Sequence, residues 1–203
     1  MPQTKTLLDF LKNRRSTTTT LLTGPGPTPA QLHDILTIGL RVPDHGKLEP
    51  WRLIVVEGAA RQVLGKRLAE DFYTEKNTLT ERQQEKLSNI IMYSVTDVPL
   101  MIYVVSSLNE KATNIPRDEQ LLSAGAVCMN IILAANAMGY GANWISGWLA
   151  YSQRAKNTIG IKSNEQIAGV IFIGTGSNQL ADRKRPDLQE KVHYWSIGED
   201  SQP

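Results

Sequence analysis

Apolar residues recur with helical spacing along much of the chain. Leu7, Leu8 and Leu11 predict a first helix that ends where the polar stretch at Arg14 begins. Helix-capping signals, such as Thr28 followed by a proline, mark the starts of several later helices. The pattern predicts these later helices over residues 29–40, 59–75, 80–93, 116–137 and 152–160.

Shorter apolar runs predict strands over residues 51–57, 100–105, 142–146 and 167–174, with a further short strand at 192–195. The run at 100–105 is apolar without interruption, which is typical of a strand buried on both faces inside a sheet. The helix over 116–137 is apolar nearly all round, so we expect it at the centre of the domain or of a dimer. The more polar helices 59–75 and 80–93 are expected to face solvent, as a lid.

Predicted helices outnumber strands and do not alternate with them regularly, which favours an α+β layer fold over a Rossmann-type sheet. No G-x-G-x-x-G motif joins a strand to a helix. A chain of 203 residues can bury one substantial core, so we expect a single domain over residues 1–203.

The formal net charge of +2 is small, and the basic residues are mixed with acidic ones. This distribution gives little reason to expect nucleic acid as a partner. Cys128 stands alone in an apolar run, which indicates a buried thiol and excludes an internal disulfide. No secretory signal is evident, and the apolar stretches 98–105 and 167–174 are far shorter than the ~20 residues of a membrane span. We therefore expect a soluble cytoplasmic protein.

Motifs for several common chemistries are missing from the sequence. His33, His45 and His193 lack metal-ligand spacing, and there is neither a G-x-S-x-G elbow nor a P-loop. A metal site and a side-chain acid–base pair are therefore not expected. A bound cofactor is the remaining source of reactivity.

Three local patterns could bind such a cofactor. Arg14, Arg15 and Ser16 offer guanidinium and hydroxyl donors for a phosphate, although a solvated charged helix end is the alternative interpretation. Arg41 and His45 lie on a proline-stiffened loop, which is either a site or an ordinary surface loop.

The third pattern surrounds Trp144, where glycines and small residues flank an aromatic plane that suits a flat ligand. Ordinary core packing of the indole is the alternative. Arg183 and Arg185 could add phosphate contacts, or could belong to a solvated basic loop.

Five motifs in order carry a resemblance to the nitroreductase family, most of all to its YdjA-like branch. They are Asn-Arg-Arg-Ser16, Arg-Val-Pro-Asp-His-Gly-Lys-Leu-Glu-Pro-Trp51, Gly-Tyr-Gly-Ala-Asn-Trp-Ile-Ser-Gly147, Phe-Ile-Gly-Thr175 and Arg-Pro-Asp-Leu188. The likeness extends from about residue 5 to residue 195. It implies an α+β fold with a central mixed or antiparallel sheet flanked by helices, in an intertwined homodimer.

The resemblance also implies FMN in two clefts at the dimer interface and NADH or NADPH as electron donor. Hydride would pass to flavin N5 and then, in a ping-pong cycle, to an electron-poor acceptor such as a nitroaromatic or a quinone. No side chain is expected to be catalytic, because the flavin carries the hydride. A flavin-storage protein, and dehydrogenation or dehalogenation on the same fold, are the alternatives. A nucleic-acid-binding domain is a more distant one.

The family motifs assign roles to particular residues. Arg14, Arg15 and Ser16 match contacts to the phosphate and ribityl chain, and Arg41 and His45 match positions that reach the flavin from the partner subunit. Residues along the flavin are Trp144, Ile145 and Ser146, and the nicotinamide stretch is Ala134, Ala135, Asn136, Ala137, Met138 and Gly139. Ile145 departs from an arginine expected in this branch. Arg183 or Arg185 is expected to compensate.

Overall fold

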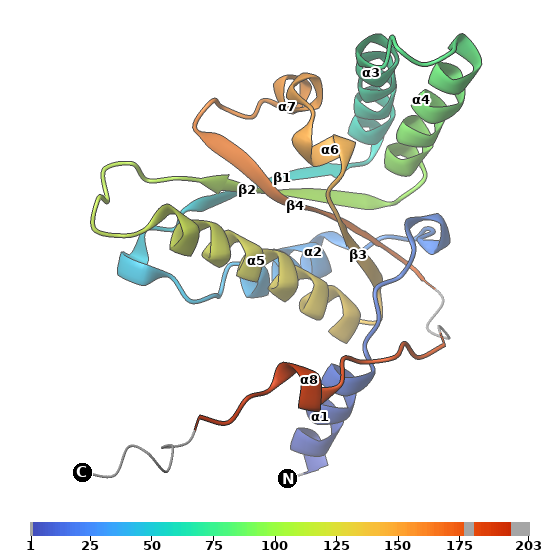
Figure 1. The fold of residues 1–203 in the computed structure, drawn as a ribbon. Coiled ribbons are helices and arrows are strands. Elements are labelled where there is room, and N and C mark those ends of the chain that lie inside the picture. Colours follow the sequence, from blue (N-terminus) through green and yellow to red (C-terminus); the bar gives the residue numbers. More distant parts are fainter. Residues whose placement is uncertain (1, 177–180, 196–203) are drawn as a thin grey trace.

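A four-stranded antiparallel sheet separates two layers of helices in the computed structural model, which describes residues 2–176 and 181–195 (Figure 1). The strand order is β1-β2-β4-β3, so the two strands of continuous apolar sequence are the inner ones. The strands are β1 (Trp51–Glu57), β2 (Leu100–Ser107), β3 (Gly141–Ile145) and β4 (Glu165–Gly174). All four agree with the sequence predictions within two residues.

Helices cover both faces of this sheet. α3, α4, α6 and α7 lie over one face, whereas α5 and α2 lie over the other (Figure 1). The described helices are α1 (Pro2–Asn13), α2 (Pro29–Gly39), α3 (Ala59–Glu75), α4 (Glu81–Thr96), α5 (Arg117–Ala137), α6 (Trp148–Tyr151), α7 (Gln153–Ile159) and α8 (Leu188–Lys191). The chain therefore has the expected α+β architecture.

Local signals set several helix ends where the sequence predicted them. The Thr28 hydroxyl accepts from the Gln31 backbone N–H, and the Gln31 side chain accepts from the Thr28 N–H in return. The Ser152 hydroxyl caps α7, and Gly160 ends it in a left-handed conformation with φ 81°.

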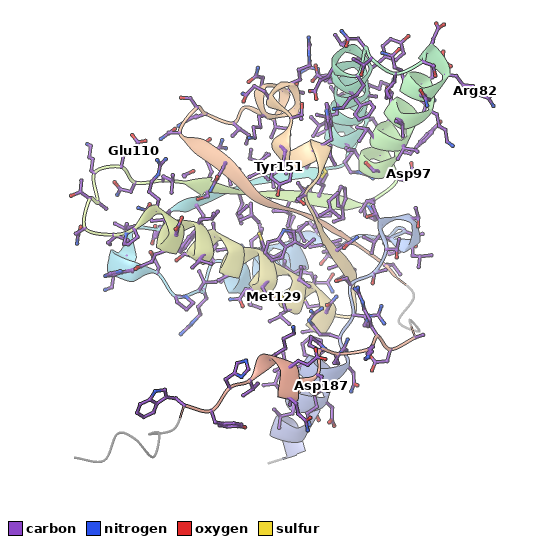
Figure 2. All side chains as sticks on the ribbon, viewed as in Figure 1. Arg82, Asp97, Glu110, Met129, Tyr151 and Asp187 are labelled. Carbon is purple, nitrogen blue, oxygen red and sulfur yellow. The ribbon has the colours of Figure 1, made fainter. Side chains whose placement is uncertain are left out.

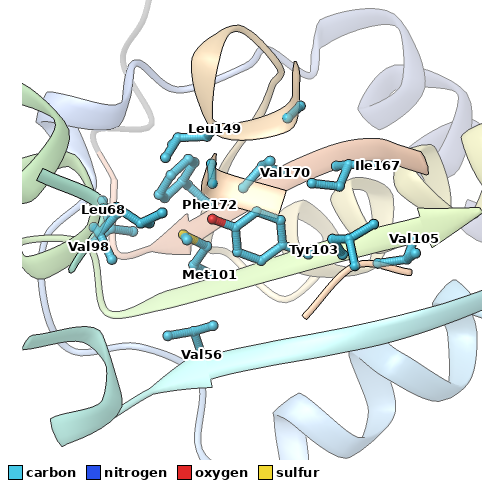
Figure 3. Packing of buried hydrophobic residues seen from close by; sticks show 14 of the residues in the cluster. Val56, Leu68, Val98, Met101, Tyr103, Val105, Leu149, Ile167, Val170 and Phe172 are labelled. Carbon is cyan, nitrogen blue, oxygen red and sulfur yellow. The ribbon is translucent and has the colours of Figure 1, made fainter. Parts of the chain in front are cut away.

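The first half of the core lies between the sheet and α3, α6 and α7 (Figure 3). Phe172 of β4 packs there with Leu68 of α3 and Leu149 of α6. Tyr103 of β2 is fully buried in the same cluster, and burial raises the pKa of its hydroxyl. Phe72 and Leu68 of α3 are buried as well, so this helix is part of the core rather than only a solvent-facing lid.

The second half of the core lies between the sheet and α5 with α2. Cys128 and Ile131 of α5 are fully buried there, and burial raises the pKa of the Cys128 thiol to about 12. α5 is 21 residues long and contains an 18-residue stretch with a mean hydropathy of 1.5, long and apolar enough to cross a membrane, but the helix packs against β2, β3 and β4. Its composition is therefore explained by its central position in the fold.

Three parts of the described chain differ from the prediction. Residues 192–195 form no strand, because this segment leaves α8 without a neighbouring strand to pair with; Tyr194 and Trp195 are highly exposed. The short helices α6 and α8 are not among the predicted elements, since four residues are too few for a periodic signal. The prolines of the loop at 23–29 do not prevent Thr23 from forming a single β-bridge with Thr175.

Candidate cofactor site

A cavity of about 340 Å³ opens where the end of α1 meets β3 and the C-terminal arm, residues 181–195. Every lining residue has a polar or charged side chain, and most of them are arginines. The lining residues are Arg14, Arg15, Ser16, Thr18, Asn143, Arg183 and Arg185. Residues from three distant parts of the sequence thus converge on one cavity.

The segment after α1 is fixed against the edge strand β3. The backbone N–H of Thr17 donates to the carbonyl of Ala142 at 2.9 Å, and Thr17 is buried. A Cβ atom on Gly141 would lie 2.9 Å from the Thr17 hydroxyl oxygen, so only glycine allows this approach. The half-buried Arg14 and Arg15 are thereby held at the mouth of the cavity instead of extending from a free helix end.

The C-terminal arm brings the other two arginines to this place. Arg185 donates to the backbone carbonyl of Lys12 at 3.1 Å, and Arg15 donates to the carbonyl of Ala181. Arg185 also forms an ion pair with Asp182 at 3.0 Å. Figure 1 shows α8 beside α1, away from the sheet. Four guanidinium groups therefore surround one cavity, and one of them is neutralised by a carboxylate.

Trp144 directly follows the lining residue Asn143 on β3 but does not itself line the cavity, and its side chain lies on the α5 side of the strand. Its indole lies across Gly169 of β4, where an added Cβ atom would be 2.2 Å from the indole Nε1. The ring also approaches Gly125 of α5, and it is 39% exposed. Ordinary core packing is thus only part of its role, because a large part of the ring remains open to a ligand.

Ile145 points to the opposite face of the sheet and packs against the first half of the core. This orientation follows from the alternation of side chains along a strand, since Trp144 occupies the α5 side. The isoleucine is therefore accommodated as a core residue. Arg183 and Arg185 line the cavity in which a further cation was expected.

The segment that follows β3 is held in place by the end of α3. Ser146 is exposed, Gly147 turns with φ 61°, and Trp148 begins α6. The carboxylate of Glu75, the last residue of α3, accepts hydrogen bonds from Trp148 Nε1 at 2.9 Å and from the Ser152 hydroxyl. Burial raises the pKa of Glu75, but these two hydrogen bonds together with Lys76 outweigh it, so the net shift is downward.

Arg41 and His45 do not line the cavity. They lie on the loop before β1, which is held on α5 by side chains between Glu119 and Asn130, whereas no residue of α5 lines the cavity. Asn130 of α5 donates to the Arg41 carbonyl at 2.8 Å, and Glu119 contacts the His45 imidazole at 2.7 Å. Positions 119 and 137 of one straight helix are roughly 27 Å apart. Within one chain, the residues predicted to form one site therefore fall into two separate groups.

The stretch assigned to nicotinamide binding forms the last turn of α5 and its cap. Ala134 and Ala135 are buried in the second half of the core, so their side chains do not face solvent. Ala137 and Gly139 are exposed and Asn136 and Met138 are half-buried, so the stretch presents a surface from residue 136 onward. The nicotinamide assignment stays a prediction.

Two lining residues were missed in the sequence. Thr18 belongs to a run of threonines that gives no sign of which hydroxyl faces a ligand. Asn143 directly precedes Trp144, and its amide donates to the Thr19 hydroxyl at 3.3 Å. The alternation of β3 could have indicated that Asn143 points away from the side occupied by Trp144.

Comparison with known proteins identifies the family. The model of the nitroreductase family matches residues 11–175, and "Putative NAD(P)H nitroreductase YdjA" of Escherichia coli K12 is 34% identical over 168 residues, which cover 83% of this chain and 87% of that protein. The chain belongs to the nitroreductase family. The matched region includes the segment 14–18, the 41–50 loop and β3.

Solved structures agree with this membership. The nitroreductase-like family protein from Bacillus cereus superposes with a TM-score of 0.77 at 25% identity, covering 94% of this chain and 96% of that one. The FMN- and NADPH-dependent nitroreductase NfnB from a Sphingopyxis strain gives a TM-score of 0.71 at 17% identity, over 94% of this chain and 99% of that one. The α+β layers described above are thus the nitroreductase-like fold.

Proposed function

We propose that this protein is an FMN-dependent oxidoreductase that uses NADH or NADPH to reduce nitroaromatics or other electron-poor acceptors. The observation that carries the proposal is the convergence of four arginines on one cavity, which is also lined by Asn143, the neighbour of the partly exposed Trp144 on β3. Names of relatives support both cofactors: YdjA is named for NAD(P)H, and NfnB for FMN and NADPH. We further propose that the chain is a single domain and acts in the cytoplasm.

The cavity fits the polar end of FMN. A phosphate dianion requires charge-assisted donors, which the arginines supply, and Ser16 adds a hydroxyl at the same place. Thr18 and Asn143 offer donors and acceptors suited to the hydroxyls of a ribityl chain. A flavin ring extending from this cavity would meet Trp144 and the exposed Ser146. The donor set therefore agrees with the cofactor that the family implies.

A homodimer would unite the two separated groups of residues. The face of α5 turned away from the sheet is apolar and incompletely buried, with Met129 on it (Figure 2) and Leu122 71% exposed. Ala126 on the same face is small enough for a second helix to pack closely. If two α5 helices cross in antiparallel orientation about a two-fold axis, the start of each lies beside the end of the other. His45 of one subunit would then approach the cavity of its partner.

When bound, FMN supplies the hydride-accepting chemistry, and alternate binding of donor and acceptor gives a ping-pong cycle. The chain's own residues bind and orient the cofactor. Arg14 and Arg15 neutralise the phosphate, and Trp144 excludes water from one side of the ring. No acid or base from the protein is required in this scheme. A site built from cations, hydroxyls and one aromatic ring agrees with such a mechanism.

Ligand titration tests the phosphate site directly. Apoprotein should bind FMN at least about 100-fold more tightly than riboflavin, because charge-assisted contacts to a phosphate are worth about 3 kcal/mol or more. Equal affinity for the two flavins would contradict the role given to the arginines. Steady-state rates with NADPH and a nitroaromatic should give parallel double-reciprocal lines, and intersecting lines would contradict the ping-pong order.

A further inference from the structure

The loop before β1 is held on α5 by three side chains of that helix. Asn130 donates to the carbonyl of Arg41, and the Ser123 hydroxyl donates to the carbonyl of Pro43 at 3.0 Å. Both contacts hold the backbone of the loop. The third contact differs, because Glu119 Oε2 lies 2.7 Å from Nδ1 of the His45 side chain.

The backbone around His45 is unusually constrained. Lys47 and Glu49 have φ of 53° and 48°, in the left-handed region that residues other than glycine rarely adopt. A hydrogen bond from the Glu49 N–H to the Asp44 carboxylate at 2.8 Å closes the turn. A Cβ atom on Gly46 would lie 2.6 Å from the Ile115 side chain, so the loop also packs closely against the start of α5. The loop thus fixes the position from which the imidazole projects.

Glu119 determines how the imidazole is presented. A carboxylate can only accept, so the contact places a hydrogen on Nδ1 and directs Nε2 away from α5. The His45 side chain is 61% exposed, and Glu119 is its sole hydrogen-bond partner among the residues that the structure describes. An exposed ion pair contributes little to stability, so this orientation has no evident value for folding alone.

We infer that Glu119 is a positioning residue of the flavin site: it holds His45 with Nδ1 protonated, so that Nε2 contacts the flavin bound by the partner subunit. This inference rests on the proposed function, because the flavin and the dimer are both part of that proposal. It assigns to the first turn of α5 a role in the cofactor site, although no residue of α5 lines the phosphate cavity of the same chain. His45 would touch the ligand, and Glu119 would act only through His45.

The test combines affinity with a direct view of the ring. Glu119→Ala should weaken FMN binding by about tenfold, and Glu119→Gln, which keeps an acceptor, should recover part of the loss. The double variant His45→Ala/Glu119→Ala should bind no more weakly than His45→Ala alone. Asp118→Ala removes the same charge from the same helical turn and should leave FMN binding within about twofold, which controls for the helix dipole.

Nitrogen NMR of the apoprotein supplies a second readout that does not depend on FMN. The His45 signals, assigned with the His45→Ala variant, should show the hydrogen on Nδ1 in the wild type and a changed distribution in Glu119→Ala. If the wild type binds FMN but Glu119→Ala binds it equally well, the inference is overturned and the proposed function stays intact. The same holds if the losses of FMN affinity in Glu119→Ala and His45→Ala add up in the double variant. A wild type that binds no FMN would overturn both, whatever the state of the ring.

Discussion

Trp144 lies directly on Gly169, the residue of β4 that leaves room for the indole. A Cβ atom at position 169 would be 2.2 Å from Nε1, closer than two atoms can approach without movement. Because Gly169 has no side chain, the indole can lie flat on β4, one residue along β3 from the cavity-lining Asn143. Orientation of this plane depends on a glycine that contacts no ligand in the proposed site.

Gly169→Ala should consequently displace Trp144. We expect FMN affinity to fall by about tenfold, together with a shift in tryptophan emission, because the ring must rotate off β4. Gly24→Ala is a matched control, since nothing lies within 4 Å of a Cβ atom there. Unchanged FMN affinity in a folded Gly169→Ala protein would show that Trp144 is not part of the cofactor site.

Local patterns in the sequence predict most of this fold. Periodicity and caps locate α2 to α5 and all four strands, because each of these elements buries one face or carries a capping residue. The presence of Arg14 and Arg183 in the lining of one cavity could not be predicted in this way. It depends on how the arm after β4 returns to α1, which is a long-range contact without a local signal.

The same limitation applies to the pairing of His45 with Glu119. Each residue looks like an ordinary surface side chain when its own neighbourhood is read alone, and 74 positions separate them. Only the packing of the loop along α5 brings them together. The family resemblance indicated that His45 matters, whereas the structure shows what holds it.

Arginine variants test the composition of the phosphate site. Arg15→Ala and Arg183→Ala should each weaken FMN binding by about 10- to 100-fold, since each removes charge-assisted donors. Lys184→Ala is the matched control, because Lys184 lies between two lining arginines without lining the cavity itself. Fluorescence titration measures all three. If Lys184→Ala lost as much FMN affinity as Arg183→Ala, the arginines would act through the general positive charge of the region and not through specific contacts with the phosphate.

A charge on the outer face of α5 should prevent dimer formation. Ala126→Glu places a carboxylate in the proposed helix–helix contact, and we expect a monomer in sedimentation that also binds FMN poorly. Ile90→Glu, on the exposed surface of α4, serves as control and should remain a dimer. A monomeric wild type, or an Ala126→Glu dimer with normal FMN binding, would contradict the shared site.

The ion pair of Arg52 with Glu165 predicts a pH dependence of stability. Arg52 donates to both carboxylate oxygens of Glu165, at 2.8 and 2.7 Å. These hydrogen bonds, helped by those from the Lys162 backbone N–H and the Ser107 hydroxyl and opposed by burial, lower the pKa of Glu165 from 4.5 to about 2 in the folded state. A depressed folded pKa stabilises the protein above pH 4.5, and that contribution is lost as the pH falls from 4.5 toward 2.

Glu165→Gln should therefore be less stable at pH 7, by about 1–3 kcal/mol in the free energy of unfolding. Its stability should also vary less with pH than that of the wild type between pH 5 and pH 2. Denaturant titrations at several pH values measure both effects. Glu70→Gln, at an exposed position on α3, provides the reference. Parallel pH profiles for the wild type and Glu165→Gln would refute the assignment.

The absorption spectrum of the FMN-reconstituted protein, recorded anaerobically before and after addition of NADH or NADPH, tests the central claim most directly. We predict a flavin spectrum that bleaches with at least one of the two nucleotides and returns when a nitroaromatic is added. A protein that takes up no FMN would contradict the proposed site. Bound FMN that neither nucleotide reduces would instead indicate a flavin-binding protein without this activity.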